Sequence, residues 1–341
     1  MVLRLSHKDQ DFEAKFLALL AMKREVSEDV DQAVRSIIED VRARGDQAVL
    51  DYTARFDRLK LDAAYLRVSA AEIEAALAQC DAKTLDALRL AHTRIASHHA
   101  RQRPQDDRYT DAIGVELGHR WTAIEAVGLY VPGGTASYPS SVLMNAVPAR
   151  VAGVPRIVMV VPTPDGVLNP LVLAAAHLAG VDEIYRIGGA QAVAALAYGT
   201  QSIAPVAKIV GPGNAYVAAA KRRVFGQVGI DMIAGPSEVV ILADGSANPD
   251  WIAADLLAQA EHDVAAQSVL ITDNVALGHA VEQAVATRLL HLPRREIAAA
   301  SWRDFGAIIE VANLQAAVPL VDRLAPEHLE IEAEDAAVSY T

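Results

Sequence analysis

Apolar residues recur at helical spacing through the first hundred positions of the chain. Between residues 30 and 41 they follow one another at i, i+4, i+7, i+8 and i+11, and Gly45 is placed to end that helix. Ser69 and Glu72 form a capping box ahead of a further helix. The amino-terminal part of the chain is therefore predicted to be mainly helical.

Short β-branched runs alternate with helical stretches in the middle of the chain. The expected strands are residues 156–161, 183–187 and 207–210. Glycine turns follow the second and third strands, and each turn leads into a helix, which is the pattern of right-handed βαβ units on a parallel sheet. Sheets of this kind bind ligands beyond the carboxyl ends of their strands, where these glycine turns lie.

A second alternating region follows, with strands expected at residues 238–242 and 268–272 and helices at 249–262 and 274–290. The chain is therefore predicted to be an α/β protein with two parallel-sheet regions flanked by helices. The two regions could be distant copies of one unit, although no short repeat is visible.

These patterns predict one domain inserted into another. A helical segment, residues 1–26, opens the chain. A discontinuous α/β domain takes residues 27–129 and 236–341, and the inserted α/β domain takes residues 130–235.

Composition places the chain among compact cytoplasmic proteins. Of its 341 residues 52% are apolar, which argues against a disordered chain. The net charge of −12 works against binding DNA, RNA or an anionic membrane. Neither a signal segment nor a membrane-spanning run is expected, and the single cysteine, Cys80, suits a reducing compartment. We interpret Cys80 as a small apolar residue at a helix end, with a reactive thiol as the alternative.

Polar side chains lie in or beside the glycine turns of the middle region. Gln191 and Asn214 each open a helix behind such a turn, where they could meet a ligand at the sheet edge. Gly211 and Gly213 supply only part of a dinucleotide fingerprint, and glycine in these turns often serves the backbone alone. Tyr130 precedes a glycine-rich loop, and it could contact a ligand or pack as a strand aromatic.

Three polar residues of the second region are candidates for substrate or metal contacts. Ser237 lies in what resembles a nucleophile turn, but no base or oxyanion hole is near in the sequence, which favours a substrate-contacting hydroxyl. Gln259 and His262, at i and i+3, project from one helix face and could be part of a divalent-metal site. Two ligands do not make a zinc site, and a polar helix end capped by His262 is the alternative.

A carboxylate and an imidazole stand side by side in the run Ala325-Pro326-Glu327-His328-Leu329-Glu330. A neighbouring Glu and His can divide two proton transfers between them, as a multi-step oxidation or hydrolysis needs. The alternative is a solvated loop pair.

In their order along the chain, these segments resemble the histidinol dehydrogenase family. The most specific stretches are residues 128–148, 188–191, 211–214, 234–238, 259–262 and 325–330. The resemblance implies a cytoplasmic enzyme that uses NAD and one zinc ion per subunit, and that finishes histidine biosynthesis. Such an enzyme oxidises L-histidinol twice, through retained L-histidinal, to L-histidine. The resemblance also implies two domains of incomplete Rossmann-like topology and a homodimer.

The resemblance also implies a role for each candidate residue. The family's NAD contacts are matched by Tyr130, Gln191 and Asn214. Its substrate contacts are matched by Ser237, Gln259, His262 and His328, and Gln259 and His262 are also matched to zinc ligands. Its catalytic proton acceptors are matched by Glu327 and His328. We expect His328 to take the alcohol proton and Glu327 to activate the water that attacks the aldehyde, while zinc orients the substrate.

The chain stops at Thr341, whereas members of that family continue. Their tail supplies an Asp and a His that bind zinc and a Glu that contacts substrate. We therefore expect the 341-residue chain to bind zinc poorly, and the family's swapped dimer is not assured without the tail. Two alternatives stay open: a paralogue that oxidises another polar alcohol, such as a sulfonated diol, and a tail-less relative without catalytic activity.

Overall fold

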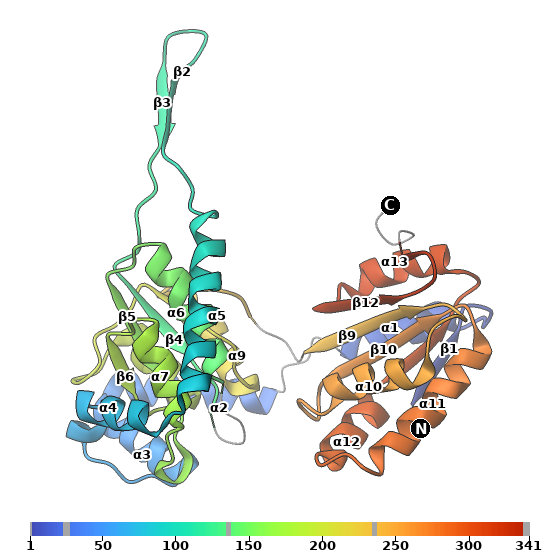
Figure 1. The fold of residues 1–341 in the computed structure, drawn as a ribbon, viewed down its shortest axis with the longest axis horizontal. Helices are drawn as coiled ribbons and strands as arrows, with labels where there is room; N and C mark the ends of the chain where they lie inside the picture. The colour runs from blue at the N-terminus through green and yellow to red at the C-terminus, as the bar shows by residue number, and fades with distance from the viewer. Residues whose placement is uncertain (1, 23–27, 134–137, 234–236, 337–341) are drawn as a thin grey trace. The chain divides into compact units, whose positions relative to one another are not determined.

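The structure, a computed structural model, describes residues 2–22, 28–133, 138–233 and 237–336. The chain divides into two compact units, each with a five-stranded parallel sheet (Figure 1). Unit 1 comprises Met1–Glu25 and Gly235–Thr341, and unit 2 comprises Val26–Ala234. The predicted α/β class, with parallel sheets flanked by helices, is confirmed. Within the described ranges, no helix is long and apolar enough to cross a membrane.

The sheet of unit 2 has the strand order β6-β5-β4-β7-β8, and all neighbouring strands are parallel. Its strands are β4 (Ala126–Tyr130), β5 (Arg156–Val160), β6 (Glu183–Tyr185), β7 (Lys208–Val210) and β8 (Gly229–Ile230). The central strand β4 is buried at all of its positions. This burial follows because helices cover both faces of a parallel sheet.

One face of this sheet packs against a core cluster formed by α2 (Glu28–Arg44), α3 (Asp46–Phe56), α8 (Gly189–Tyr198) and α9 (Ala215–Val224). The other face packs against α4 (Ala70–Gln79), α5 (Ala82–Ala100), α6 (Pro139–Val151) and α7 (Pro170–Leu178). The capping box expected at Ser69 and Glu72 is present at the start of α4. The short 3₁₀ helices Ala63–Tyr65 and Pro164–Gly166 lie in connections.

An antiparallel hairpin, β2 (Asp107–Thr110) and β3 (Glu116–His119), extends away from the body of unit 2 (Figure 1). Every residue of both strands is exposed. Tyr109 and Leu117 are cross-strand partners, so the hairpin carries apolar side chains into solvent.

The sheet of unit 1 has the strand order β1-β11-β10-β9-β12, again all parallel. Its strands are β1 (Leu3–Ser6), β9 (Glu238–Ala243), β10 (Gln267–Thr272), β11 (Ala307–Glu310) and β12 (His328–Glu332). One face packs on α10 (Pro249–Ala260), α11 (Val275–Leu289) and α12 (Arg295–Phe305), and the other on α1 (Phe12–Met22) and α13 (Leu314–Leu324).

The structure divides the chain differently from the division expected from the sequence. Residues 27–129, expected to join 236–341, belong to unit 2, because Val34 and Ile38 of α2 share a core cluster with Val158 of β5. Residues 3–6, expected within a helical segment, form β1 and pair with β11 in unit 1. Helical spacing reports which face of α2 is buried, but not which sheet covers it.

Cys80 caps the carboxyl end of α4 and is half-buried. Its thiol donates a hydrogen bond to the carbonyl oxygen of Ala76 at 3.3 Å. Burial raises the pKa of the Cys80 thiol, which keeps it in its unreactive protonated form. These contacts agree with its interpretation as a small apolar residue at a helix end.

Candidate active site

Tyr130 ends β4 at the carboxyl edge of the sheet of unit 2. Its side chain is 4% exposed, and its hydroxyl oxygen accepts a hydrogen bond from the backbone N–H of Gly189 at 3.0 Å. Burial raises the pKa of Tyr130 to about 12, so the phenol stays neutral at physiological pH. Tyr130 is thus a packed strand aromatic that also fixes the turn after β6.

Gln191 lies in the first turn of α8, directly behind that turn. Its side chain is 1% exposed, and its Oε1 has no hydrogen-bond partner among the described residues. A buried polar atom left unpaired costs about 1–3 kcal/mol, so a donor on a bound molecule would satisfy it. Gly189 has a φ of +64°, and a Cβ there would lie 2.7 Å from Gln191 Oε1. Glycine therefore leaves room around this atom.

Asn214 caps the amino end of α9, behind β7. Its Oδ1 accepts the backbone N–H groups of Tyr216 and Val217 at 3.1 and 3.2 Å. The turn ahead of it closely approaches β4, since a Cβ on Gly211 would lie 2.1 Å from the carbonyl oxygen of Tyr130. Asn214 therefore has a structural task as a helix cap, and its exposed side chain stands at the same sheet edge as Tyr130.

The three residues expected to contact NAD thus gather at the carboxyl ends of β4, β6 and β7. The amino ends of α8 and α9 also lie at this edge, and helix amino ends attract phosphate groups. The strand order reverses between β4 and β7, which is where open sheets of this kind bind ligands. The glycine turns and the Gln191 oxygen, which has no partner in the described ranges, fit a nucleotide cofactor here.

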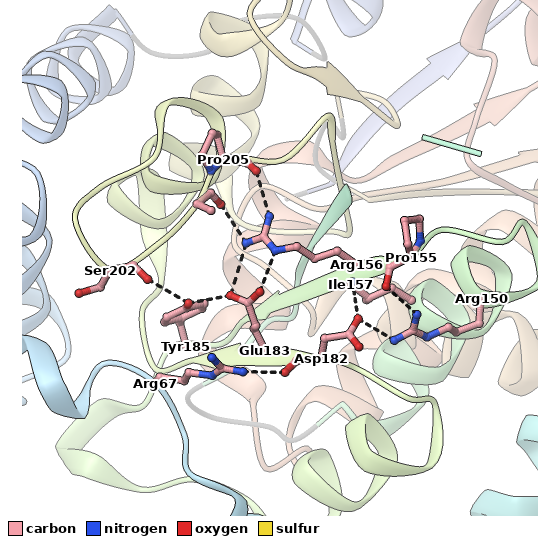
Figure 2. A network of polar contacts seen from close by, with 11 residues as sticks. Arg67, Arg150, Pro155, Arg156, Ile157, Asp182, Glu183, Tyr185, Ser202 and Pro205 are labelled. Atoms are coloured by element: carbon pink, nitrogen blue, oxygen red, sulfur yellow. Dashed lines mark hydrogen bonds and ion pairs between the residues drawn. The ribbon is translucent and has the colours of Figure 1, made fainter. Parts of the chain in front are cut away.

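The amino edge of the same sheet is closed by a polar network (Figure 2). Arg156, at the start of β5, donates to Glu183 Oε1 at 2.7 Å and to the carbonyl oxygens of Ala204 and Pro205 at 3.1 and 3.0 Å. The hydrogen bond from Arg156 lowers the pKa of Glu183. These contacts tie the loop before β7 to β5 and β6, so this edge serves a structural purpose.

Glu327 lies between α13 and β12 in unit 1, and His328 is the first residue of β12. Ala325 ends α13 in the left-handed conformation, with a φ of 43°, and Pro326 follows, so the helix stops directly before the pair. His328 Nε2 and Glu327 Oε1 are 4.0 Å apart, and their side chains are 59% and 57% exposed. Within unit 1, both groups can therefore exchange protons with solvent or with a bound molecule.

Gln259 and His262 lie at the carboxyl end of α10. Gln259 is 8% exposed, and its Nε2 has no hydrogen-bond partner in the described part of the chain. The backbone N–H of His262 donates to the Gln259 carbonyl oxygen at 3.1 Å, so the backbone of His262 closes the helix end. The imidazole is on an exposed residue and is available as a ligand.

The candidates of unit 1 lie at the amino edge of its sheet. His328 begins β12 in register with Val239 of β9, and Ser237 directly precedes β9. The Ser237 carbonyl oxygen accepts the N–H of Gln267, at the start of β10, at 3.1 Å. Helix α10 runs back across the sheet between two parallel strands, so its last turn returns to the amino edge. The structure therefore brings the expected proton-transfer, substrate and zinc residues of unit 1 to one edge.

The donor set at the end of α10 fits half of a zinc site. An amide oxygen from Gln259 and an imidazole nitrogen from His262 can both bind a divalent metal. The helix expected to reach residue 262 ends at Ala260, so His262 lies in the turn after α10, and its backbone contact with Gln259 keeps the two residues adjacent. A tetrahedral site needs two further donors.

An acidic group beside these residues was missed by the sequence analysis. Single oxygens of Asp255, Glu330 and Glu332 lie within 4.8 Å of one another. Burial, and then the charge of Asp255, raises the pKa of Glu330 and of Glu332. Oxygen ligands of this kind suit hard divalent cations. The available signals are Asp255 four residues before Gln259, and Glu330 and Glu332 alternating from His328 along one face of β12.

Comparison with known proteins gives consistent matches. The histidinol dehydrogenase family model matches residues 20–340. Histidinol dehydrogenase of Mesorhizobium japonicum is 70% identical over 336 residues, which cover 98% of this chain and 78% of that protein. The Brucella abortus enzyme is 69% identical with the same coverage.

A solved structure agrees with these matches. The crystal structure of histidinol dehydrogenase from Elizabethkingia anophelis has a TM-score of 0.88 to this chain at 35% identity, covering 100% of this chain and 77% of that one. Because both the family model and relatives of this similarity span nearly the whole sequence, the chain belongs to the histidinol dehydrogenase family of NAD-dependent oxidoreductases.

Proposed function

We propose that this chain oxidises L-histidinol to L-histidine in two NAD-dependent steps, through L-histidinal held in the site, as the last step of histidine biosynthesis in the cytoplasm. The observation that carries the proposal is the Glu327–His328 pair. It lies at the sheet edge that also carries Ser237, Gln259 and His262, in a chain of the histidinol dehydrogenase family.

His328 is assigned to the first oxidation. A neutral imidazole nitrogen can accept the alcohol proton as the carbon–hydrogen bond breaks. NAD, when bound by Tyr130, Gln191 and Asn214, supplies the hydride acceptor for both oxidations. The exposure of His328 gives the accepted proton a route to solvent before the second step.

Glu327 is assigned to the second oxidation. Its carboxylate can accept a proton from the water that attacks the aldehyde carbon, which produces the hydrate that is oxidised next. The 4.0 Å separation from His328 lets the two groups act on neighbouring oxygens of one bound substrate. Because each oxidation has its own proton acceptor, the second oxidation does not require that His328 first release the proton it accepted.

Ser237, Gln259, His262 and His328 are assigned to substrate binding. The buried amide nitrogen of Gln259, which has no partner among the residues that the structure describes, can donate a hydrogen bond to a substrate or to a neighbouring ligand. Zinc, when bound by Gln259 and His262, would orient the imidazole and amine of histidinol.

We further propose that the chain forms a homodimer, as its family resemblance implies. Support comes from the β2–β3 hairpin, whose exposed apolar side chains include Tyr109, Ile113 and Leu117, and from the exposed Trp121 that follows the hairpin. An isolated two-stranded hairpin is marginally stable in water, so contact with a second copy would stabilise it. Light scattering of the purified chain tests this directly, and a monomer at all concentrations would contradict it.

The test of the proposed reaction is NADH formation from histidinol with added zinc. The expected result is two NADH and one histidine for each histidinol consumed. NADH from a sulfonated diol but not from histidinol would instead assign the chain to a paralogous alcohol dehydrogenase. A folded chain that binds NAD yet oxidises neither alcohol would indicate a non-catalytic relative.

A further inference from the structure

Lys221 is buried within α9 although it carries a charge. Its side chain is 2% exposed, and Nζ donates to the carbonyl oxygen of Gly211 at 3.0 Å and pairs with Asp231 Oδ1. Asp231 Oδ2 accepts the backbone N–H of the same glycine at 2.7 Å. The two side chains therefore hold both the N–H and the C=O of Gly211, and their ion pair closes the ring.

Asp231 is itself fixed to the sheet. It directly follows β8, and its backbone N–H donates to the carbonyl oxygen of Ile209 in β7 at 3.2 Å. Its Oδ1 also accepts the backbone N–H of Met232 at 2.7 Å. The carboxylate thus reaches Gly211 from a rigid position.

Net stability does not account for this pair. Removing two charges from water offsets most of their mutual attraction, and apolar side chains of similar volume often stabilise a protein as well or better. Instead, the pair fixes the backbone conformation of one residue, Gly211. Gly211 has a φ of +113°, in the left-handed region, where its backbone groups cannot follow the regular strand pattern.

The neighbouring glycine turn is held in a comparable way. The N–H of Gly189, after β6, is bound by the hydroxyl of Tyr130, and Tyr130 is one of the proposed cofactor contacts. Both turns at this sheet edge thus have a glycine N–H fixed by a polar side chain from another element.

We propose that Lys221 and Asp231 are positioning residues of the cofactor site, an inference that rests on the proposed use of NAD. By fixing Gly211, the pair sets the path of the turn that leads to Asn214 and the amino end of α9. Neither side chain needs to touch the cofactor, because both act through the Gly211 backbone.

The test uses Asp231→Asn, which is nearly isosteric, and the double variant Lys221→Met/Asp231→Asn, which leaves no unpaired buried charge. We expect the Kd for NAD, measured by calorimetry on the full chain, to rise about tenfold, the effect of losing one hydrogen bond to a charged group. Amide exchange at Gly211 should speed up, and KM for histidinol should stay unchanged. The control is Glu183→Gln, which breaks an ion pair at the opposite edge of the same sheet.

The control variant should lose a comparable amount of Tm while keeping the wild-type Kd for NAD. The proposal is overturned if the Asp231 variant lowers Tm but binds NAD as the wild type does, or if the wild type does not bind NAD. If the wild type binds NAD but forms no NADH from histidinol, the proposed reaction fails, and the shift in Kd still decides the positioning role.

Discussion

Units 1 and 2 share a core strand order but present their candidate residues at opposite edges. The shared orders are β6-β5-β4-β7 in unit 2 and β11-β10-β9-β12 in unit 1. In each unit the order reverses beside β4 or β9, which comes first in the chain among the four shared strands. Unit 2 has its candidates at the carboxyl side of that reversal, as expected for such sheets. Unit 1 has Ser237 and His328 at the amino ends of β9 and β12, the two strands between which its order reverses.

In each unit, contacts between polar groups of the protein occupy the sheet edge that carries no candidate site residues. On the carboxyl side of β9, Asp244 Oδ2 accepts the N–H of Glu334 at 2.9 Å and Oδ1 accepts the N–H of Ser246 at 2.8 Å. A carboxylate there repels the phosphates that a glycine turn at a helix amino end attracts. In unit 2, Arg156 and Glu183 close the amino edge instead. Strand order therefore defines the two possible edges, and the polar side chains select between them.

The largest expected effect comes from Glu327→Gln, which removes the proposed proton acceptor at the amino edge of unit 1. Histidine formation should fall by about 10²–10⁴-fold, the usual contribution of a general base, and an aldehyde trap should capture histidinal. NAD binding should be unchanged, because the NAD residues belong to unit 2. Glu334→Gln, at the carboxyl edge of the same sheet, is the control. Equal histidine formation by Glu327→Gln and wild type would place the second proton acceptor elsewhere.

Gly211→Ala should have the next largest effect, now at the carboxyl edge of unit 2. The added Cβ would meet the Tyr130 carbonyl oxygen at 2.1 Å. We expect a lower Tm and a weaker affinity for NAD. Gly226→Ala is a matched control, since Gly226 has a φ of +102° and nothing within 4 Å of the added Cβ.

The Gly226 control should show only the backbone cost, about 1–2 kcal/mol for a left-handed non-glycine residue, with NAD affinity unchanged. Equal losses of NAD affinity in both variants would contradict the assignment of the Gly211 turn to the cofactor.

Glu330→Gln should have a smaller effect, of opposite sign, on stability. Burial and the charge of Asp255 raise the pKa of Glu330. The uncharged form therefore stabilises the fold fully below its unfolded pKa of about 4.3, and this contribution is lost as pH rises through the folded pKa. Glu330→Gln should raise the free energy of unfolding at neutral pH by less than about 1 kcal/mol after solvent screening, which is seen as a higher Tm, with no gain in acid. A fall in Tm at neutral pH would mean that the ionised form is stabilised, for example by a cation.

Asp244→Asn should have the smallest effect. Hydrogen bonds, first from the Ser246 side chain, lower the pKa of Asp244. Such a group stabilises the fold above its unfolded pKa of about 3.9, and this contribution is lost as pH falls through the folded pKa. The variant should be slightly less stable than wild type at neutral pH and indistinguishable in strong acid. A thermal melt at each pH measures both differences, and a constant difference across pH would rule out titration of Asp244.

The regular elements were predictable because they depend on local pattern. Strands β5, β6, β7, β9 and β10, the helices that follow them and the capping box at Ser69 follow from spacing and capping chemistry, whereas the other five strands of the two sheets were not predicted. The run Leu3–Ser6 was not recognisable as a strand, because its partner β11 lies about three hundred residues away in the sequence. The packing of α2 against the sheet of unit 2 was not predicted for the same reason, because the residues that meet are far apart in the sequence.

The candidate site residues could be named from the sequence, but their arrangement could not. Glu327 and His328 are adjacent in the chain, so their proximity needed no tertiary information. The acidic group joins Asp255 on α10 to Glu330 and Glu332 on β12; the local patterns place each residue on a face of its own element, but they do not show that the two elements meet there. The burial of Lys221 could not be foreseen either, since lysine on a helix usually faces solvent.

The pairing of β1 with β11 has a consequence for synthesis. The core of unit 2 is encoded as one continuous segment, Val26–Ala234, so it can fold while the chain is still being made. Leu3–Ser6 is synthesised about three hundred residues before its partner Ala307–Glu310. Strand β1 therefore stays unpaired while the intervening residues are made, and Leu5, which is buried in the folded unit, stays exposed during that time.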